Sequence, residues 1–277
     1  MTLSVCYDLR TAPITYDFAG FLSFSDCMRQ LTGDSDMHVT IRAEGFRRES
    51  PRDKSMTEAE KSSRIHGILV PLLGLCPSVS GFSVEYVSQY DYQVSRPIAT
   101  PYTVSKVCDL AAKGADPQFM RAPDFVTVPD CDVVLSPRMS RHFKERNCEL
   151  FAWHKFYRHL VAKGLEVIVI PDQDNWQAFA EFGWRLYWPA AWDITARIAL
   201  FEKGFPVVSA MGPASILYYT KRPFLLFDNV KAVFSDQQWA DLHGTEIGGQ
   251  IPFLSENQRV TWSESTFDNL MAEYDRS

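Results

Sequence analysis

A short turn carries the residue types best suited to hold a ligand: Met211, Gly212, Pro213, Ala214 and Ser215, directly after an apolar run. Gly212 lets the backbone come close to a bound group. Pro213 suits the first position of a helix, where its missing N–H would be unpaired anyway. The next N–H groups would point outward at the positive end of the helix dipole, an arrangement that binds phosphate. The alternative is a plain strand-to-helix turn that binds nothing.

A basic loop at 136–147, with the sequence SPRMSRHFKERN, offers guanidinium groups for the same anion. Arginine binds phosphate through two parallel hydrogen bonds, so Arg138 and Arg146 are the best candidates, with Arg141 beside them. Asn147, at the end of the loop, is at least as well suited to cap the helix that follows. The alternative for the whole loop is a solvated run of charge.

Three carboxylates are candidates for polar roles. Asp172 follows the buried run LEVIVI and is expected at the ligand edge of a parallel sheet, where it could bind a ribose hydroxyl or a base. A general base is expected from the first half of the chain, where Asp8 ends a strand and Asp17 begins a helix. Either could remove a proton from a hydroxyl if burial raised its pKa, and the alternative for Asp17 is a helix cap.

The sequence lacks the residue patterns typical of metal binding, dinucleotide binding and triad hydrolysis. His154 and His159 are five residues apart, the wrong spacing to share one helix face for a metal. Neither a phosphate-binding P-loop nor a dinucleotide-binding glycine motif is present, and no order of Ser, His and Asp favours hydrolysis. The sequence therefore predicts a site without a metal or a cofactor.

Alternating strands and helices are expected to position these residues. In the first half, strands are expected at 3–8, 37–41 and 82–86, and helices at 17–31 and from the Thr57–Glu60 capping box onward, with a kink at Pro71. In the second half, strands are expected at 124–128, 132–136, 165–170 and 205–211, and helices at 149–163 and 193–203. Asp193 is expected to cap the last of these helices, and Gly204 to end it in a left-handed conformation.

This order predicts an α/β fold with two Rossmann-like units, 1–123 and 124–245, facing each other across a cleft. A tail at 246–277 ends in an amphipathic helix with a capping pattern at Ser265 and Asp268. We expect this C-terminal helix to pack back on the first unit.

Composition limits the class of protein. The chain has 277 residues, of which 46% are hydrophobic and 22% charged, as in ordinary globular proteins. The net charge of -6 argues against a general binder of nucleic acid or anionic membranes. No apolar run is long enough to span a bilayer, and the start of the chain lacks a signal-peptide pattern. Six scattered cysteines without a CxxC pair are typical of reduced thiols, so we expect a cytoplasmic protein.

The stretch from 193 to 228 resembles the C-terminal half of GT-B-fold glycosyltransferases, notably the group of ADP-heptose:lipopolysaccharide heptosyltransferases. The whole chain also resembles a loosely characterised set of bacterial proteins encoded with polysaccharide-biosynthesis genes. The segments that carry this second resemblance are Tyr7-Asp8-Leu9, Tyr16-Asp17-Phe18, 138–147 and Gly248-Gly249-Gln250-Ile251-Pro252. One departure is that Ala210-Met211 stands where the heptosyltransferase group has Asp-Ser, which removes a hydroxyl beside the phosphate turn.

The resemblance implies a metal-independent transfer of a sugar from a nucleotide-diphosphate donor to a glycan or other small acceptor, as in surface polysaccharide synthesis. The turn at 211–215, the basic loop and Asp172 would hold the donor, and Asp8 or Asp17 would act on the acceptor. The alternatives are a nucleotide-sugar epimerase or hydrolase on the same fold, and a non-catalytic binding or scaffold protein. The sequence does not indicate an oligomeric state.

Overall fold

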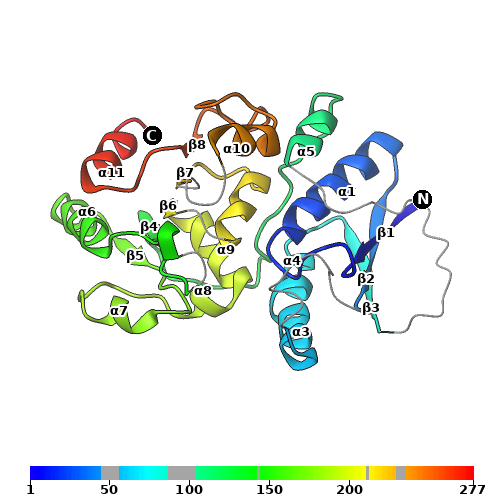
Figure 1. Cartoon of the computed structure of the whole chain (residues 1–277), viewed down its shortest axis with the longest axis horizontal. Coiled ribbons are helices and arrows are strands. Elements are labelled where there is room, and N and C mark those ends of the chain that lie inside the picture. Colours follow the sequence, from blue (N-terminus) through cyan, green and yellow to red (C-terminus); the bar gives the residue numbers. More distant parts are fainter. Residues whose placement is uncertain (45–55, 87–103, 142–143, 210–211, 229–234) are drawn as a thin grey trace. The chain divides into compact units, whose positions relative to one another are not determined.

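The computed structural model describes residues 1–44, 56–86, 104–141, 144–209, 212–228 and 235–277 (Figure 1). It forms two compact units, Met1–Arg121 and Ala122–Ser277, here called unit 1 and unit 2. Each unit has its own sheet, and every pair of neighbouring strands in both sheets is parallel. The predicted α/β class is therefore confirmed.

Unit 1 contains a sheet in the order β1-β2-β3. Its strands are β1 (Thr2–Asp8), β2 (Asp36–Arg42) and β3 (Val79–Glu85). Its helices are α1 (Phe18–Thr32), α3 (Glu58–Arg64), α4 (Val70–Leu73) and α5 (Val104–Ala111). The alternation that predicted β1 is real, because Leu3, Val5 and Tyr7 are buried and their neighbours are more exposed.

The helix ends of unit 1 follow local rules. Thr57 and Glu60 form the predicted capping box at the start of α3. Gly33 ends α1 with φ 72°, a left-handed conformation that glycine adopts without strain. The predicted irregularity near Pro71 takes the form of a π-helical segment, Ile65–Leu69, between α3 and α4. Proline has no N–H for the carbonyl four residues earlier, so the α-helical pattern is interrupted there.

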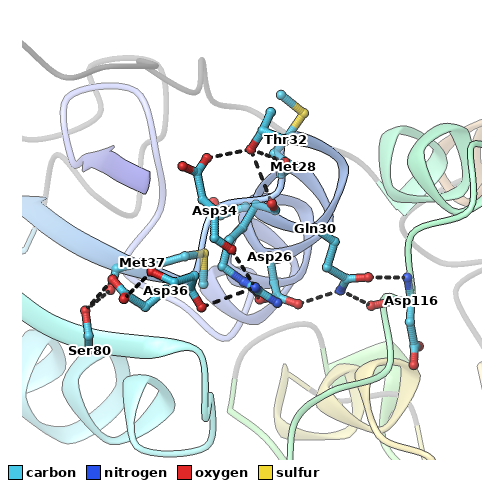
Figure 2. A network of polar contacts seen from close by, with 12 residues as sticks. Asp26, Met28, Gln30, Thr32, Asp34, Asp36, Met37, Ser80 and Asp116 are labelled. Carbon is cyan, nitrogen blue, oxygen red and sulfur yellow. Dashed lines mark hydrogen bonds and ion pairs between the residues drawn. The ribbon is translucent and has the colours of Figure 1, made fainter. Parts of the chain in front are cut away.

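A buried carboxylate ties α1 to the end of unit 1 (Figure 2). Asp26 accepts hydrogen bonds from Arg29 Nε and Gln30 Nε2, each at 2.7 Å. The Gln30 amide also pairs with the backbone of Asp116, donating to its carbonyl and accepting from its N–H at 2.8 Å each (Figure 2). The charge of Arg29 compensates the burial of Asp26, and the network fixes the segment that follows α5.

Unit 2 contains a sheet in the order β5-β4-β6-β7-β8. Its strands are β4 (Val133–Ser136), β5 (Val167–Val169), β6 (Phe205–Ser209), β7 (Phe224–Phe227) and β8 (Gln258–Thr261). The chain runs from β4 outward to β5 and then continues on the other side of β4 with β6. The strand expected at 124–128 is wrong, because Pro123 and Pro129 bracket the run and proline cannot donate to a strand ladder.

The helices of unit 2 flank this sheet. They are α6 (Leu150–Ala162), α7 (Trp176–Ala180), α8 (Pro189–Trp192), α9 (Ile194–Lys203), α10 (Asp236–His243) and α11 (Phe267–Tyr274). Asp193 caps α9 as predicted, accepting from the N–H groups of Thr195 and Ala196. Within the described ranges, no helix is long and apolar enough to cross a membrane.

The expected left-handed conformation of Gly204 is wrong, since its φ is -114°. Gly204 leads straight from α9 into β6 with extended backbone. Because glycine has no side chain, the backbone at Gly204 can lie close to Cys131. A Cβ there would lie 2.7 Å from Cys131 Sγ and 3.1 Å from the Cys131 carbonyl oxygen. The glycine thus lets α9 turn tightly against the start of β4.

The C-terminal tail is part of unit 2. β8 pairs with β7, and Leu270 of α11 is fully buried in the hydrophobic core of this unit. The Tyr274 ring meets the Phe156 ring of α6 edge-on, with 5.5 Å between centroids. The apolar stripe of α11 therefore completes the core of unit 2, and the expectation that it covers the first unit is wrong.

Candidate functional site

The strand order of unit 2's sheet indicates where a candidate site lies. In open parallel sheets of this order, ligands bind beyond the carboxyl ends of the strands where the chain changes direction. Here that point lies between β4 and β6, which end in Ser136 and Ser209, both buried. The basic loop follows β4 directly, and the segment with Asp172 follows the neighbouring β5. Several of the predicted residues therefore lie along one edge of the sheet.

The basic loop is held in place by its own asparagine. Asn147 Oδ1 accepts from the Ser140 N–H at 3.0 Å and from the Arg138 guanidinium at 2.5 Å. The Asn147 amide donates to the Ser140 carbonyl at 2.9 Å. The capping alternative for Asn147 is wrong, because Glu149 occupies the cap position of α6. Asn147 instead orients Arg138, which is buried.

Two aspartates bind this loop to the segment after β5. Asp172 accepts from the N–H groups of Met139 at 3.0 Å and of Asp174 at 3.2 Å. Asp174 accepts from the Ser140 hydroxyl at 2.7 Å and from the Arg141 N–H at 2.9 Å. Arg141 Nε donates to the Asp174 carbonyl, so this arginine is directed to the acidic segment. A carboxylate can accept about four hydrogen bonds, and Asp172 accepts these two from the residues that the structure describes, which leaves capacity for a ligand hydroxyl among them.

Arg138 and Arg146 influence each other electrostatically. Burial lowers the pKa of Arg138, and the charge of Arg146 lowers it further, while Asp172 acts in the opposite direction. Burial raises the pKa values of Tyr218 and Asp228, and the charge of Arg146 opposes both rises. Arg146 is thus within electrostatic range of residues beyond β6 as well as of Arg138. Two neighbouring cations at the edge of a sheet favour an anion with more than one negative charge.

The glycine-proline turn differs from the prediction. Gly212–Tyr219 is a 3-10 helix, not an α-helix. A 3-10 helix closes its hydrogen bonds one residue earlier, so fewer N–H groups stay open at its start. Ser215 uses its hydroxyl locally, donating to the Gly212 carbonyl at 2.8 Å. Residues 216–220 are all buried, so the sequence has no helical alternation of apolar and polar residues that could show which kind of helix forms here. Pro213 is half-buried, Ala214 is buried, and Met211 lies outside the described residues.

Sequence reasoning missed a polar group at the end of β7. Asp228 is buried there and accepts a 2.6 Å hydrogen bond from Trp239 Nε1. The His243 ring stacks on the Trp239 ring with 3.9 Å between centroids. Burial lowers the pKa of His243. The hydrogen bond to the Trp239 carbonyl and the charge of Asp228 act in the opposite direction. The signal was available, because Asp228 follows the apolar run FLLF just as Asp172 follows LEVIVI.

A buried arginine at the end of β4 was also missed. Arg197 of α9 donates from Nε to the Ala190 carbonyl at 2.9 Å and from Nη1 to Ser136 Oγ at 3.0 Å. It therefore brings a third guanidinium to the strand that precedes the basic loop. A charged residue on the apolar face of a predicted helix was the sequence signal.

The two candidate bases of unit 1 differ. Asp8 pairs with Arg10, with 2.5 Å between Nη2 and Oδ2. Burial raises the pKa of Asp8, but the hydrogen bonds and charge of Arg10 outweigh burial, so the pKa lies below its ordinary value. The expected upward shift is therefore wrong for Asp8. Asp17 is exposed at the start of α1, accepts from the Thr15 hydroxyl at 2.7 Å, and makes no side-chain capping bond to that helix.

Metal ligands do not gather in the part of the chain that the structure describes: it contains no group of three or more His, Cys, Asp or Glu side chains placed to hold an ion. His154 faces aromatic rings instead, with 5.1 Å between its centroid and that of Phe182.

The fold is similar to that of two solved glycosyltransferase structures. Heptosyltransferase WaaC of E. coli with ADP is 12% identical, with a TM-score of 0.53 over 100% of this chain and 99% of that chain. A glycosyl transferase family 9 protein from Veillonella parvula is 7% identical, with a TM-score of 0.51 over 99% of this chain and 88% of that chain. No protein-family model matches the sequence, and no curated protein matches it either. At these identities the likeness concerns the fold, so the chain has a glycosyltransferase fold, as the resemblance in the sequence implied.

Proposed function

We propose that the protein is a glycosyltransferase that moves a sugar from a nucleotide-diphosphate donor to an acceptor hydroxyl. The observation that carries the proposal is the pair Arg138 and Arg146, which bring two mutually repelling positive charges to the carboxyl edge of unit 2's sheet. The likeness to glycosyltransferase structures supports the same class of reaction.

The chemistry requires positive charge at the leaving group. When the bond from the sugar to the diphosphate breaks, negative charge develops on the phosphate oxygens. Guanidinium groups held in place before the reaction stabilise that charge without reorganising. Arg138 is held by Asn147, and Arg146 lies near it. We propose that these arginines do the work for which other transferases use a metal ion. The N–H groups at the start of Gly212–Tyr219, with Pro213 in its first turn, would add to them.

The acceptor needs a base to take the proton of its attacking hydroxyl. We propose Asp17 for this role and rank Asp8 below it, because Arg10 holds Asp8 in its ionised, weakly basic form. We propose that the reaction belongs to the cytoplasmic synthesis of a surface glycan.

A thermal-shift panel tests the proposal. ADP, GDP, UDP, CDP and dTDP are each added in excess, and at least one should raise the melting temperature, since a ligand that binds only the folded state stabilises it. No shift with any of the five would contradict the proposed function. With the nucleotide known, turnover of its sugars separates the rivals: transfer requires an added acceptor, whereas epimerisation and hydrolysis do not. A scaffold protein would show a shift and no turnover.

A further inference from the structure

Three tryptophans are exposed close to the end of β5. Trp176 begins α7 and is 42% exposed. Trp188 directly precedes α8 and is 36% exposed, and Trp192 is the last residue of α8 and is 60% exposed. The segment does have a core to bury such side chains, because Trp184 is buried against Phe179, with 5.6 Å between ring centroids. The exposed rings are therefore left out of a core that lies beside them, and clustered exposed aromatic surface commonly binds a ligand.

Two of these rings form a fixed corner. The ring centroids of Trp176 and Trp188 are 5.7 Å apart with an interplanar angle of 81°, an edge-to-face contact. The corner leaves each ring partly open to solvent. A flat aromatic ligand can stack on one indole while its edge meets the other.

Hydrogen bonds tie this corner to the candidate site. Asn175, next to Trp176, donates from its amide to the Met139 carbonyl of the basic loop. Gln173 donates from its amide to the Ala191 carbonyl of α8, which follows Trp188. The elements that carry the two rings are thus fastened both to each other and to the loop that carries Arg138.

The topology indicates what the corner holds. In dinucleotide-binding units the phosphates lie at the first strand's turn, and a carboxylate at the end of the second strand binds the ribose. β4 and β5 are the first and second strands of unit 2's sheet, and Asp172 follows β5. With the diphosphate at Arg138 and Arg146 and the ribose at Asp172, the base would extend toward α7 and α8. We propose that Trp176 and Trp188 form the nucleobase subsite of the donor, an inference that rests on the proposed function.

The test compares a nucleotide with its phosphates alone. Wild type and the variants Trp176→Ala, Trp188→Ala and Phe125→Ala are titrated calorimetrically with the tightest of ADP, GDP, UDP, CDP and dTDP, and with inorganic pyrophosphate. Phe125 is a matched control, an 85% exposed ring in the segment before β4. Each tryptophan variant should bind the nucleotide about tenfold more weakly, because stacking on one ring contributes about that factor. Pyrophosphate affinity should not change, and Phe125→Ala should behave as wild type.

The outcomes separate the two proposals. If wild type binds a nucleotide and the tryptophan variants bind it equally well, the nucleobase subsite is overturned while the proposed function stands. An equal loss of affinity for pyrophosphate overturns the subsite too, because it indicates general damage to the site. In a transfer assay, a change confined to the KM of the acceptor would also overturn the subsite. Binding of no nucleoside diphosphate by wild type contradicts both proposals. Trp188→Phe should recover most of the nucleotide affinity, since phenylalanine also stacks.

Discussion

The indole N–H of Trp239 donates a 2.6 Å hydrogen bond to the buried carboxylate of Asp228, eleven residues earlier in the chain. The bond joins the end of β7 to α10 and fixes a carboxylate at the ligand edge of unit 2's sheet. Burial raises the pKa of Asp228, and His243, Trp239 and Arg146 only partly oppose this rise. The protonated, neutral form of Asp228 is therefore more favoured in this site than it would be in water.

This relationship predicts a pH-dependent effect of Asp228→Asn. The folded state binds the proton of Asp228 more tightly than the unfolded chain does. Its contribution to stability is therefore present below the ordinary pKa of 3.8 and is lost as the pH rises through the folded value. The amide cannot ionise. The free energy of unfolding of the variant should therefore improve relative to wild type as the pH rises above 3.8.

Urea unfolding at several pH values measures this difference. Trp239→Phe serves as a control, because it removes the hydrogen bond but leaves the titrating carboxylate. The free energy of unfolding of this variant should therefore still depend on pH. Parallel stability curves for wild type and Asp228→Asn would contradict the assigned pKa shift.

Two glycines should respond to alanine in opposite ways. At Gly204 a Cβ would meet Cys131 Sγ at 2.7 Å, so Gly204→Ala should destabilise by about 1–3 kcal/mol through overpacking. At Gly67, in the helical segment Ile65–Leu69, a Cβ would meet nothing within 4 Å, so Gly67→Ala should stabilise by roughly 0.5–1 kcal/mol. Chemical unfolding midpoints measure both effects. Equal tolerance at the two sites would be inconsistent with the close approach of α9 to β4.

Replacing Asp17 should separate catalysis from stability. Asp17→Asn should lower kcat by a factor on the order of 10²–10⁴ if the carboxylate takes the acceptor's proton. Its melting temperature should stay near that of wild type, because the amide oxygen of asparagine can still accept from the Thr15 hydroxyl and no side-chain capping bond to α1 is lost. Asp8→Asn provides the contrast: it breaks the pair with Arg10 and should cost stability near neutral pH. That cost should be full above pH 3.8 and should shrink as the pH falls below 3.8, through the lower pKa that Asp8 has in the fold. Full activity in Asp17→Asn would remove this residue from the mechanism.

Local features of this chain were predictable from sequence. The Thr57–Glu60 capping box, the Asp193 cap and the alternation of β1 each depend on residues within a few positions of one another. The strands β4, β5 and β6 were found because buried parallel strands appear as short apolar runs between turn residues. Those runs also indicated which loops lie at the ligand edge.

Features that depend on distant partners were not predictable. β8 begins with the buried Gln258, whose amide donates to the carbonyls of Thr220 and Arg222. A polar residue satisfied across the fold breaks the apolar pattern that marks a strand. The same reason hid Arg197, whose charge is buried against Ser136, sixty-one residues away.

The central claim is that a diphosphate binds at Arg138 and Arg146, and calorimetric titration with a nucleoside diphosphate tests it most directly. Arg146→Ala should weaken binding by at least tenfold, since a charge-assisted bidentate contact is lost. Arg185→Ala is the matched control, because Arg185 pairs with Glu166 at the opposite, amino end of β5. The account predicts loss of affinity in the first variant and none in the second. Equal affinity in wild type and both variants would contradict it.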